Sequence, residues 1–204
     1  MITLKKTLLL LAGSPGTGKS YFDNWIRKEI PGFNETSIDV YKEKLYDEYG
    51  FDTPAERDKL DDKAYKMFYQ SVEDLMKQGK SIICDYPFSY RQHDTLGAMA
   101  KKYDFQIITI TLRADLDILY ERQKERDMDP ERHLGHLMNH YHKGDVVEDR
   151  TKIDIQKTKE EYEEFNKKRD YANFKLGKTI FLDVSDFATA DYQGTIDKIK
   201  AWTK

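Results

Sequence analysis

Apolar and polar positions along the chain follow two alternating patterns. Short, nearly continuous apolar runs at 7–12, 81–85, 105–112 and 179–184 are typical of buried strands, and a short second strand is expected over 35–39. Between them, apolar residues recur three or four positions apart, as in a helix with one buried face. The segments predicted to be helical are 19–30, 41–49, 54–78, 90–102, 115–126, 152–174 and 192–202. Strands that alternate with helices predict an α/β fold, with a parallel sheet and helices on both faces.

The most informative stretch joins the first predicted strand to the first predicted helix. It has the form G-x-x-x-x-G-K-S, the phosphate-binding loop or P-loop, and consists of Gly13, Ser14, Pro15, Gly16, Thr17, Gly18, Lys19 and Ser20. The glycines allow successive backbone N–H groups to point into one concavity, and the following helix directs its positive end there. Lys19 is expected to reach the β- and γ-phosphates, and Ser20 to ligate Mg²⁺. The pattern predicts binding of a nucleoside triphosphate, with ATP and Mg²⁺ as the expected ligands.

Two aspartates are expected where strands end beside the P-loop. Asp85 follows the apolar run Ile82–Cys84, which is the position of an acid that holds Mg²⁺ directly or through water. Asp39 is expected to end the short second strand, within reach of a substrate hydroxyl as a general base. Either residue could instead cap a helix, because aspartate is a common N-cap.

Arg122 and Arg126 lie four positions apart near the end of the helix predicted over 115–126. This spacing places both guanidinium groups on one helix face, from which they could close over phosphates and neutralise charge on a transferring group. The alternative is a solvated basic face paired with Glu121 and Glu125.

Histidines cluster at His133, His136, His140 and His142, within a polar segment at 127–150. Asp129-Pro130-Glu131 predicts that this segment begins as a helix, through an N-cap, a proline at the first position and an early acid. Three readings are open for the histidines: a zinc site, contact with an acceptor or phosphate, or a solvated face.

Composition narrows the class of protein. The chain has 204 residues and a formal net charge of -3, so long nucleic acid is an unlikely partner and one domain is expected. Cys84, the single cysteine, is expected to be a small core residue in a reducing compartment. No signal peptide and no apolar stretch of about 20 residues is evident, so we expect a cytoplasmic protein without a membrane partner.

With these residues in place, the chain resembles the small P-loop kinases related to polynucleotide 5′-kinase and to the AAA-like "predicted kinase" family, and more distantly the nucleoside monophosphate and shikimate kinases. The resemblance implies a three-layer P-loop NTPase fold, with a five-stranded parallel sheet in the order 2-3-1-4-5. It also implies a single kinase domain over 1–204 and a mobile helical lid at about 127–150.

Individual roles follow from the same resemblance. The family has a basic residue three positions after the acid of the second strand, and Lys42 matches that position after Asp39. Asp85 and Arg91 match the acid and the arginine after the third strand, so Asp39, Lys42, Asp85 and Arg91 are the candidate acceptor-binding residues. Tyr86-Pro87-Phe88 departs from the family's small polar residues, and this affects the choice of acceptor. Arg132 is a further lid candidate, and 185–188 is expected near the adenine.

Three functions are consistent with the sequence. The leading one is an ATP-dependent kinase in which Lys19, Asp39, Arg122 and Arg126 are catalytic. The second is an AAA-type ATPase switch, although such modules carry Asp-Glu where this chain has Asp85-Tyr86. The third is a non-catalytic nucleotide-binding module. The acceptor of a kinase could be a nucleoside or nucleotide, a nucleic-acid 5′-hydroxyl, or another small hydroxylated metabolite such as an antibiotic. The sequence does not indicate the oligomeric state.

Overall fold

The computed structural model describes residues 4–204 and is built on a parallel sheet with strands in the order β2-β3-β1-β4-β5. This arrangement confirms the predicted α/β class and the predicted strand order. Of the segments predicted from the sequence, only the single domain over 1–204 includes residues outside those described. The strands are β1 Thr7–Ala12, β2 Asn34–Glu35, β3 Ile82–Asp85, β4 Gln106–Arg113 and β5 Lys178–Asp183.

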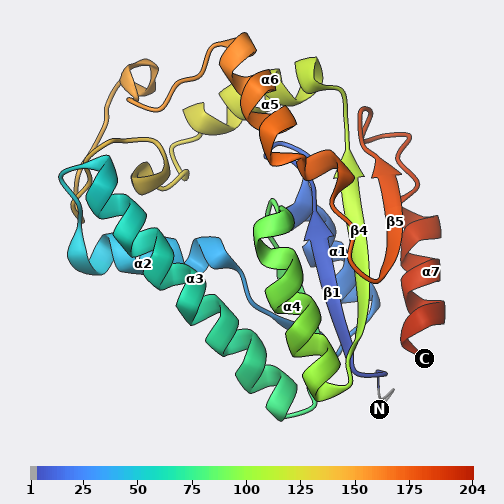
Figure 1. Cartoon of the computed structure of the whole chain (residues 1–204). Helices are drawn as coiled ribbons and strands as arrows, with labels where there is room; N and C mark the ends of the chain where they lie inside the picture. The colour runs from blue at the N-terminus through green and yellow to red at the C-terminus, as the bar shows by residue number, and fades with distance from the viewer. Residues whose placement is uncertain (1–3) are drawn as a thin grey trace.

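Helices connect the strands and cover the sheet (Figure 1). Their bounds are α1 Lys19–Glu29, α2 Ile38–Tyr49, α3 Pro54–Lys77, α4 Tyr90–Tyr103, α5 Leu116–Met128, α6 Lys159–Arg169 and α7 Tyr192–Thr203. Short 3-10 turns lie at Leu134–His136, Arg150–Lys152 and Tyr171–Asn173.

The four leucines of β1 divide the core between the two faces of the sheet. Leu8 and Leu10 belong to a cluster with residues of α3 and α4, whereas Leu9 and Leu11 belong to a cluster with residues of α1 and α7. Side chains of a strand point alternately to opposite faces, so a central strand covered on both faces must be apolar throughout. All four leucines are fully buried, and each contributes about 1.5–3 kcal/mol of transfer free energy.

Local capping signals fix the helices that support the site. Thr53 caps α3 and accepts a hydrogen bond from the Glu56 backbone N–H, with Pro54 at the first helical position. Ser89 and Gln92 form a reciprocal capping box at the start of α4. These contacts satisfy N–H groups that a helix leaves without partners in its first turn.

One strand is shorter than predicted, and the following helix begins earlier. β2 contains only Asn34–Glu35, and Ser37 in an extended conformation is the N-cap of α2. We expected Asp39 to end the second strand, but it lies in the first turn of α2. The macrodipole of a helix favours a carboxylate at this position.

The prediction of a helix that begins at Asp129-Pro130-Glu131 is wrong. Asp129 does accept a hydrogen bond from the Glu131 N–H, but the chain forms only one 3-10 turn at Leu134–His136. Leu134, Leu137, Met138 and Tyr141 instead pack in a small cluster with Tyr46 and Phe51, which come from α2 and the residues after it. Long-range burial of these side chains outweighs the local helix signal.

The prediction of a helix over 152–174 is also wrong for its first part. Residues 153–157 are not helical, and the backbone N–H of Ile155 donates to the Leu137 carbonyl. The helix α6 begins only after Thr158, which forms a capping box with Glu161, and it ends at Asp170 in the left-handed conformation. Ile153 has an extended backbone conformation and is buried in the cluster with Leu137, so the chain does not continue as a helix from Arg150–Lys152.

The lid expected at about 127–150 overlaps the end of α5 at Met128, so the name lid is used here for the segment 129–158. This segment runs from the end of α5 to α2 and α3 and returns to α6 (Figure 1). Phe51 and Tyr141 form an antiparallel bridge, with reciprocal backbone hydrogen bonds of 2.8 Å, that fastens the lid to the residues after α2. Cys84 in β3 is buried, as predicted, and burial raises the pKa of its thiol well above its usual value. Within residues 4–204, no helix is both long enough and apolar enough to cross a membrane.

Candidate active site

The P-loop lies between β1 and α1, at the carboxyl edge of the sheet. Gly13 has a φ of 126°, and a Cβ at this position would lie 2.3 Å from the Leu112 carbonyl oxygen, so the loop requires glycine there. Gly18, in the left-handed conformation, is the N-cap of α1 and provides no side-chain cap. The first N–H groups of α1 are thus left to face an anion.

Lys19 is folded back onto the loop. Its side chain is buried, and Nζ donates to the carbonyl oxygens of Gly13 at 3.0 Å and Ser14 at 3.1 Å. Burial lowers the pKa of Lys19 to about 8, an effect that Asp85 opposes and Arg126 reinforces. A polyphosphate placed in the loop would supply the negative charge that this ammonium lacks.

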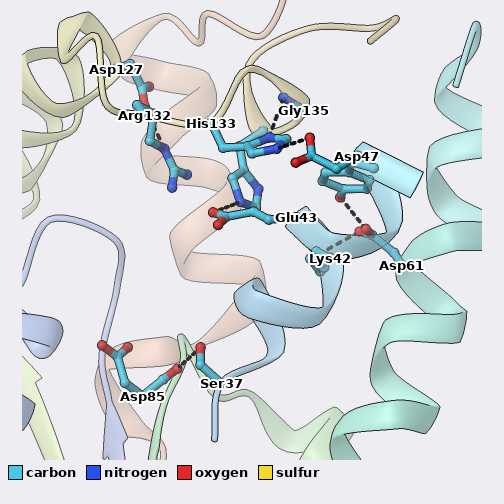
Figure 2. A network of polar contacts seen from close by, with 12 residues as sticks. Ser37, Lys42, Glu43, Asp47, Asp61, Asp85, Asp127, Arg132, His133 and Gly135 are labelled. Carbon is cyan, nitrogen blue, oxygen red and sulfur yellow. Dashed lines mark hydrogen bonds and ion pairs between the residues drawn. The ribbon is translucent and has the colours of Figure 1, made fainter. Parts of the chain in front are cut away.

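Ser20 and Asp85, the two residues expected to hold Mg²⁺, are hydrogen-bonded to each other. Ser20 Oγ donates to Asp85 Oδ2 at 2.6 Å, and the Asp85 carbonyl oxygen accepts a hydrogen bond from Ser37 Oγ at 3.0 Å (Figure 2). Ser89, not Asp85, caps the following helix α4, so capping does not account for this acid. A hydroxyl and a carboxylate side by side are the hard oxygen donors that Mg²⁺ prefers, so these residues fit that ion.

Asp39 lines the same cleft as the P-loop, a cavity of about 480 Å³ that also contains Lys19, Ser20 and Asp85. Burial alone would raise the pKa of Asp39, but the electrostatic influence of the neighbouring His136, Lys42, Arg132 and Arg126 lowers it below its usual value. Its carboxylate therefore stays ionised at neutral pH. Asp39 does not cap α2, because Ser37 holds that position.

Arg126 and Arg132 bring positive charge over the P-loop from the end of α5 and from the lid. Both line the cleft, and Arg126 is exposed there. Arg132 Nε lies 3.9 Å from Asp127 Oδ1 (Figure 2), and burial together with the charge of Arg126 lowers the pKa of Arg132. Mutual repulsion between these cations would be relieved by a bound polyanion.

Arg122 also lines the cleft but makes different contacts. Its guanidinium donates to the carbonyl oxygens of Val184 at 2.8 Å and Ser185 at 2.9 Å, and it stacks 3.7 Å from the centre of the Phe187 ring. In this conformation Arg122 supports the loop after β5, and Phe187 of that loop lies next to Gly18 of the P-loop.

A second cavity, of about 620 Å³, adjoins the cleft through Tyr86 and Pro87, which line both. Lys42 and Arg91 face it, as expected for acceptor-binding residues. Lys42 Nζ forms an ion pair with Asp61 Oδ2 at 2.6 Å (Figure 2), and the hydroxyl of Tyr46 also donates to Asp61. Further lining residues are Arg57, Asp58, Asp62, Tyr65, Ser89, Gln92, His136, Phe165, Arg169 and Tyr171.

Asp61 and its neighbours on α3 line this cavity but were not expected as site residues from the sequence. Asp58, Asp61, Asp62 and Tyr65 recur at helical spacing on a flank of α3 beside its apolar stripe, and Tyr65 also packs against the core. That stripe of acids was a usable signal, but polar helix faces are usually only solvated.

Each histidine of the cluster faces a carboxylate. His133 Nε2 lies 3.1 Å from Asp47 Oδ1 and His136 Nε2 lies 2.9 Å from Glu43 Oε1, so both reach α2 from the lid (Figure 2). His142 pairs with Asp52 at 2.9 Å, and His140 lies 3.8 Å from Asp154. Over residues 4–204, no three His, Cys, Asp or Glu side chains gather into a metal-binding group, so the structure does not support the zinc reading of these histidines. Of the three readings, contact with an acceptor fits His136 alone, since it lines the second cavity.

Comparison with known proteins places the chain in a family. A family model described as an AAA domain matches residues 8–141, from β1 into the lid. A protein from Chloroflexus aurantiacus J-10-fl, assigned as a kinase, has 20% sequence identity and a TM-score of 0.75, and the match covers 97% of this chain and 98% of that one.

Two other solved structures share the fold less closely. A sugar kinase from Janibacter sp. HTCC2649 matches with 11% identity and a TM-score of 0.53, over 97% of this chain and 94% of that one. A chain of the Pnkp1/Rnl/Hen1 RNA repair complex matches with 17% identity and a TM-score of 0.52, over 87% of this chain and 48% of that one. The protein therefore belongs to the AAA-domain family, and its fold is that of the P-loop kinases.

Proposed function

We propose that the protein is a phosphotransferase that moves the γ-phosphoryl group of ATP, bound with Mg²⁺, to a hydroxyl of a small or nucleotide-like acceptor. The observation that carries the proposal is the position of Asp39. This ionised carboxylate lines the same cleft as Lys19 and Ser20, and that cleft opens through Tyr86 and Pro87 into a large polar cavity. An ATPase needs only a water molecule beside the bound ATP, whereas this second cavity, of about 620 Å³, has the volume of a small-molecule site.

The residues suit the steps of phosphoryl transfer. The P-loop and the start of α1 hold the phosphates, and Lys19 exchanges the carbonyl oxygens of Gly13 and Ser14 for phosphate oxygens. Ser20 and Asp85 would hold Mg²⁺, which neutralises charge developing on the phosphate oxygens. Asp39 accepts the proton of the acceptor hydroxyl as the new P–O bond forms and the bond to the ADP oxygen breaks.

The lid arginines complete the charge balance. Arg126 and Arg132 neutralise the transferring group from the side opposite the P-loop. Arg122 acts at the other end of the nucleotide, where its stack with Phe187 and its bonds to the loop after β5 shape the place expected for adenine. Closure of the lid would exclude water, which otherwise competes with the acceptor.

The acceptor is identified by a transfer screen. Purified protein, Mg²⁺ and ATP labelled at the γ-phosphate are incubated with pools of nucleosides, nucleotides, sugars, aminoglycosides and 5′-hydroxyl oligonucleotides. We expect labelled product in at least one pool, and none with Lys19→Ala. Lys28→Ala, which removes an exposed lysine of the same helix, is the matched control and should retain transfer. Free phosphate formed equally in all pools, including the one without acceptor, would instead favour an ATPase switch.

A further inference from the structure

Most of the basic side chains that line the second cavity already have partners within the protein. These lining residues are Lys42, Arg57, Arg91, His136 and Arg169. Lys42 Nζ lies 2.6 Å from Asp61 Oδ2. His136 Nε2 lies 2.9 Å from Glu43 Oε1, and Arg57 donates to the backbone carbonyl oxygen of residue 138 at 3.2 Å. These three contacts leave Arg91 and Arg169 as the basic groups available to a ligand.

Arg91 of α4 and Arg169 at the end of α6 make no ion pair and donate no side-chain hydrogen bond within residues 4–204. Each lies against an aromatic ring: the Arg91 guanidinium is 5.8 Å from the centre of the Tyr65 ring. The Arg169 guanidinium is 5.5 Å from the centre of the Phe165 ring. An aromatic ring contacts the face of a guanidinium and leaves the N–H groups at its edge free. Those N–H groups match the paired oxygens of a carboxylate or a phosphate.

Tyr171 shows that the two arginines act on one part of the cavity. Its side chain is buried, it lines the cavity, and its hydroxyl makes no hydrogen bond within residues 4–204. Burial raises the pKa of this phenol to about 12, and the charges of Arg169 and Arg91 oppose the rise. The phenol therefore keeps its proton at neutral pH and is a third free donor near the two guanidinium groups. Asp39 also acts on the pKa of Tyr171, so the proposed base lies near the same group.

The acids that line the cavity come from α3. Asp61 is paired with Lys42. Asp58 and Asp62 are exposed and form no ion pair within the described part of the chain. Like charges repel, so these carboxylates and Asp39 disfavour an anionic group beside α3 or at the mouth of the cavity. The favourable place for one anionic group is the wall formed by α4 and the end of α6.

We propose that the phosphoryl acceptor carries one oxyanionic group, a carboxylate or a phosphate monoester, at the end remote from its reactive hydroxyl. Arg91 and Arg169 donate to the oxygens of that group, and the Tyr171 hydroxyl donates to the same group. The body of the acceptor extends past Tyr86, which lines both the cavity and the nucleotide cleft, so that the hydroxyl reaches Asp39. The inference rests on the proposed phosphotransferase function and adds the chemical class of the acceptor: anionic hydroxyl compounds, not neutral nucleosides or polycationic aminoglycosides.

Calorimetry tests the anion site without depending on turnover. The protein is saturated with Mg²⁺ and a non-hydrolysable ATP analogue, so that a probe cannot occupy the P-loop. The probes are benzoate, phenyl phosphate and benzamide, the neutral counterpart of benzoate. We expect benzoate or phenyl phosphate to bind, and benzamide to bind at least about tenfold more weakly, because its hydrogen bonds to the arginines lack the charge. The tighter of the two anions shows whether the group is a carboxylate or a phosphate.

The chain supplies a matched control for the arginine variants. Arg91→Gln and Arg169→Gln should each weaken binding of the tighter anion by about tenfold. Lys168→Gln removes an exposed positive charge next to Arg169 but outside the cavity lining, and it should leave the affinity unchanged. If one arginine variant does not fold, as judged by circular dichroism, the other decides the test. No binding of either anion, equal affinity for benzamide and the tighter anion, or affinity unaffected by the folded arginine variants would each overturn the proposal.

A transfer assay separates the acceptor class from the reaction itself. Neutral acceptors are paired with anionic counterparts, for example ribose with ribose 5-phosphate and glucose with glucuronate. We expect labelled product from anionic acceptors, and Arg91→Gln should raise their KM about tenfold while kcat and the KM for ATP stay nearly unchanged. Equally efficient transfer to the neutral counterparts would overturn the inference but uphold phosphoryl transfer. Anion binding as predicted, with no product from any acceptor, would instead refute the transfer reaction and uphold the anion site.

Discussion

Replacing the proposed general base by its uncharged isostere, Asp39→Asn, tests the most specific part of the mechanism. The side chain keeps its size and its place in the first turn of α2, so the fold should be preserved. What changes is the ability to take a proton from the acceptor. The substitution also removes the negative charge that lies near His136, Lys42, Arg132 and Arg126.

The expected loss can be estimated from the role assigned to Asp39. A positioned general base contributes about 10²- to 10⁴-fold to the rate, which corresponds to about 2.7–5.5 kcal/mol of transition-state free energy. The loss should fall on kcat for transfer. ATP affinity should change little, because the P-loop and Lys19, not Asp39, are the residues proposed to contact the phosphates.

The depressed pKa of Asp39 adds a pH criterion. Its usual value is about 3.9, and the surrounding positive charges lower it further despite burial. Because this pKa is lower in the folded than in the unfolded protein, Asp39 stabilises the fold at pH above its unfolded-state pKa, and this stabilisation is lost as the pH falls through its folded-state pKa. Asp39 is also ionised throughout the range from about pH 5 to 8, so the wild-type rate should show no acidic limb from Asp39 there.

The assay measures transfer of labelled γ-phosphate to the acceptor found in the screen, with ATP binding followed by calorimetry. Glu48→Gln is the matched control, since it neutralises an exposed carboxylate on the same helix. A kcat of Asp39→Asn equal to that of wild type and of Glu48→Gln would refute the assignment of Asp39 as the base. A large loss of ATP affinity with unchanged kcat would place Asp39 in nucleotide binding instead.

Three further predictions concern the P-loop, the metal and the fold. The phosphates of ATP should raise the lowered pKa of Lys19, so ATP binding at pH 8 should be accompanied by the uptake of about half a proton per protein. Calorimetry in buffers of different ionisation enthalpy measures this uptake, and zero uptake would contradict a pKa of about 8 for Lys19. Ser20→Ala should raise the Mg²⁺ concentration needed for half-maximal transfer while Asp85 is unchanged, and an identical Mg²⁺ titration would remove Ser20 from the metal site. Gly177→Ala should lower the free energy of unfolding by at least about 2 kcal/mol, because Gly177 has a φ of +70° and a Cβ would lie 2.3 Å from the Ile107 carbonyl oxygen. Urea titration measures this loss, and an unchanged midpoint would show that the backbone relaxes.

The parts of the fold that local sequence determines were predictable. Four consecutive leucines in a short run that ends at the P-loop glycines indicate a strand buried on both faces, and the glycines with Lys19 and Ser20 specify a P-loop where a strand precedes and a helix follows. The Thr53-Pro54 start predicted α3 because the capping bond joins residues only three apart. In each case the interaction that decides the structure lies within the segment itself.

The lid was not predictable in the same way. Its path depends on contacts with α2 that are far away in the sequence: the pairs of His133 with Asp47 and His136 with Glu43, and a glycine at 135 whose Cβ would lie 2.4 Å from the Tyr46 ring. No local pattern tells which histidine meets which acid. The helix signal at 129–131 was real, but these contacts and the apolar cluster around Tyr46 outweighed it.

The same distinction applies to the candidate site. Ser20 and Asp85 were expected to meet because parallel strands bring their carboxyl ends to one edge of the sheet, and the structure places their oxygens 2.6 Å apart. The partner of Lys42 was not foreseen, since Asp61 lies on α3 and only the packing of α2 against α3 brings the two together. The roles of Arg122 and Arg126 stay predictions, although the contacts of Arg122 favour support of the loop after β5.

The central claim is that this P-loop transfers phosphate to an acceptor, and phosphorus NMR of a single reaction tests it most directly. Wild-type protein, Mg²⁺, ATP and the acceptor pool that gives labelled product are followed in real time. The account predicts a new phosphoester resonance that grows as fast as the ATP γ-phosphate resonance disappears, with little inorganic phosphate. Conversion of the γ-phosphate to inorganic phosphate alone, at a rate independent of the acceptor, would contradict it.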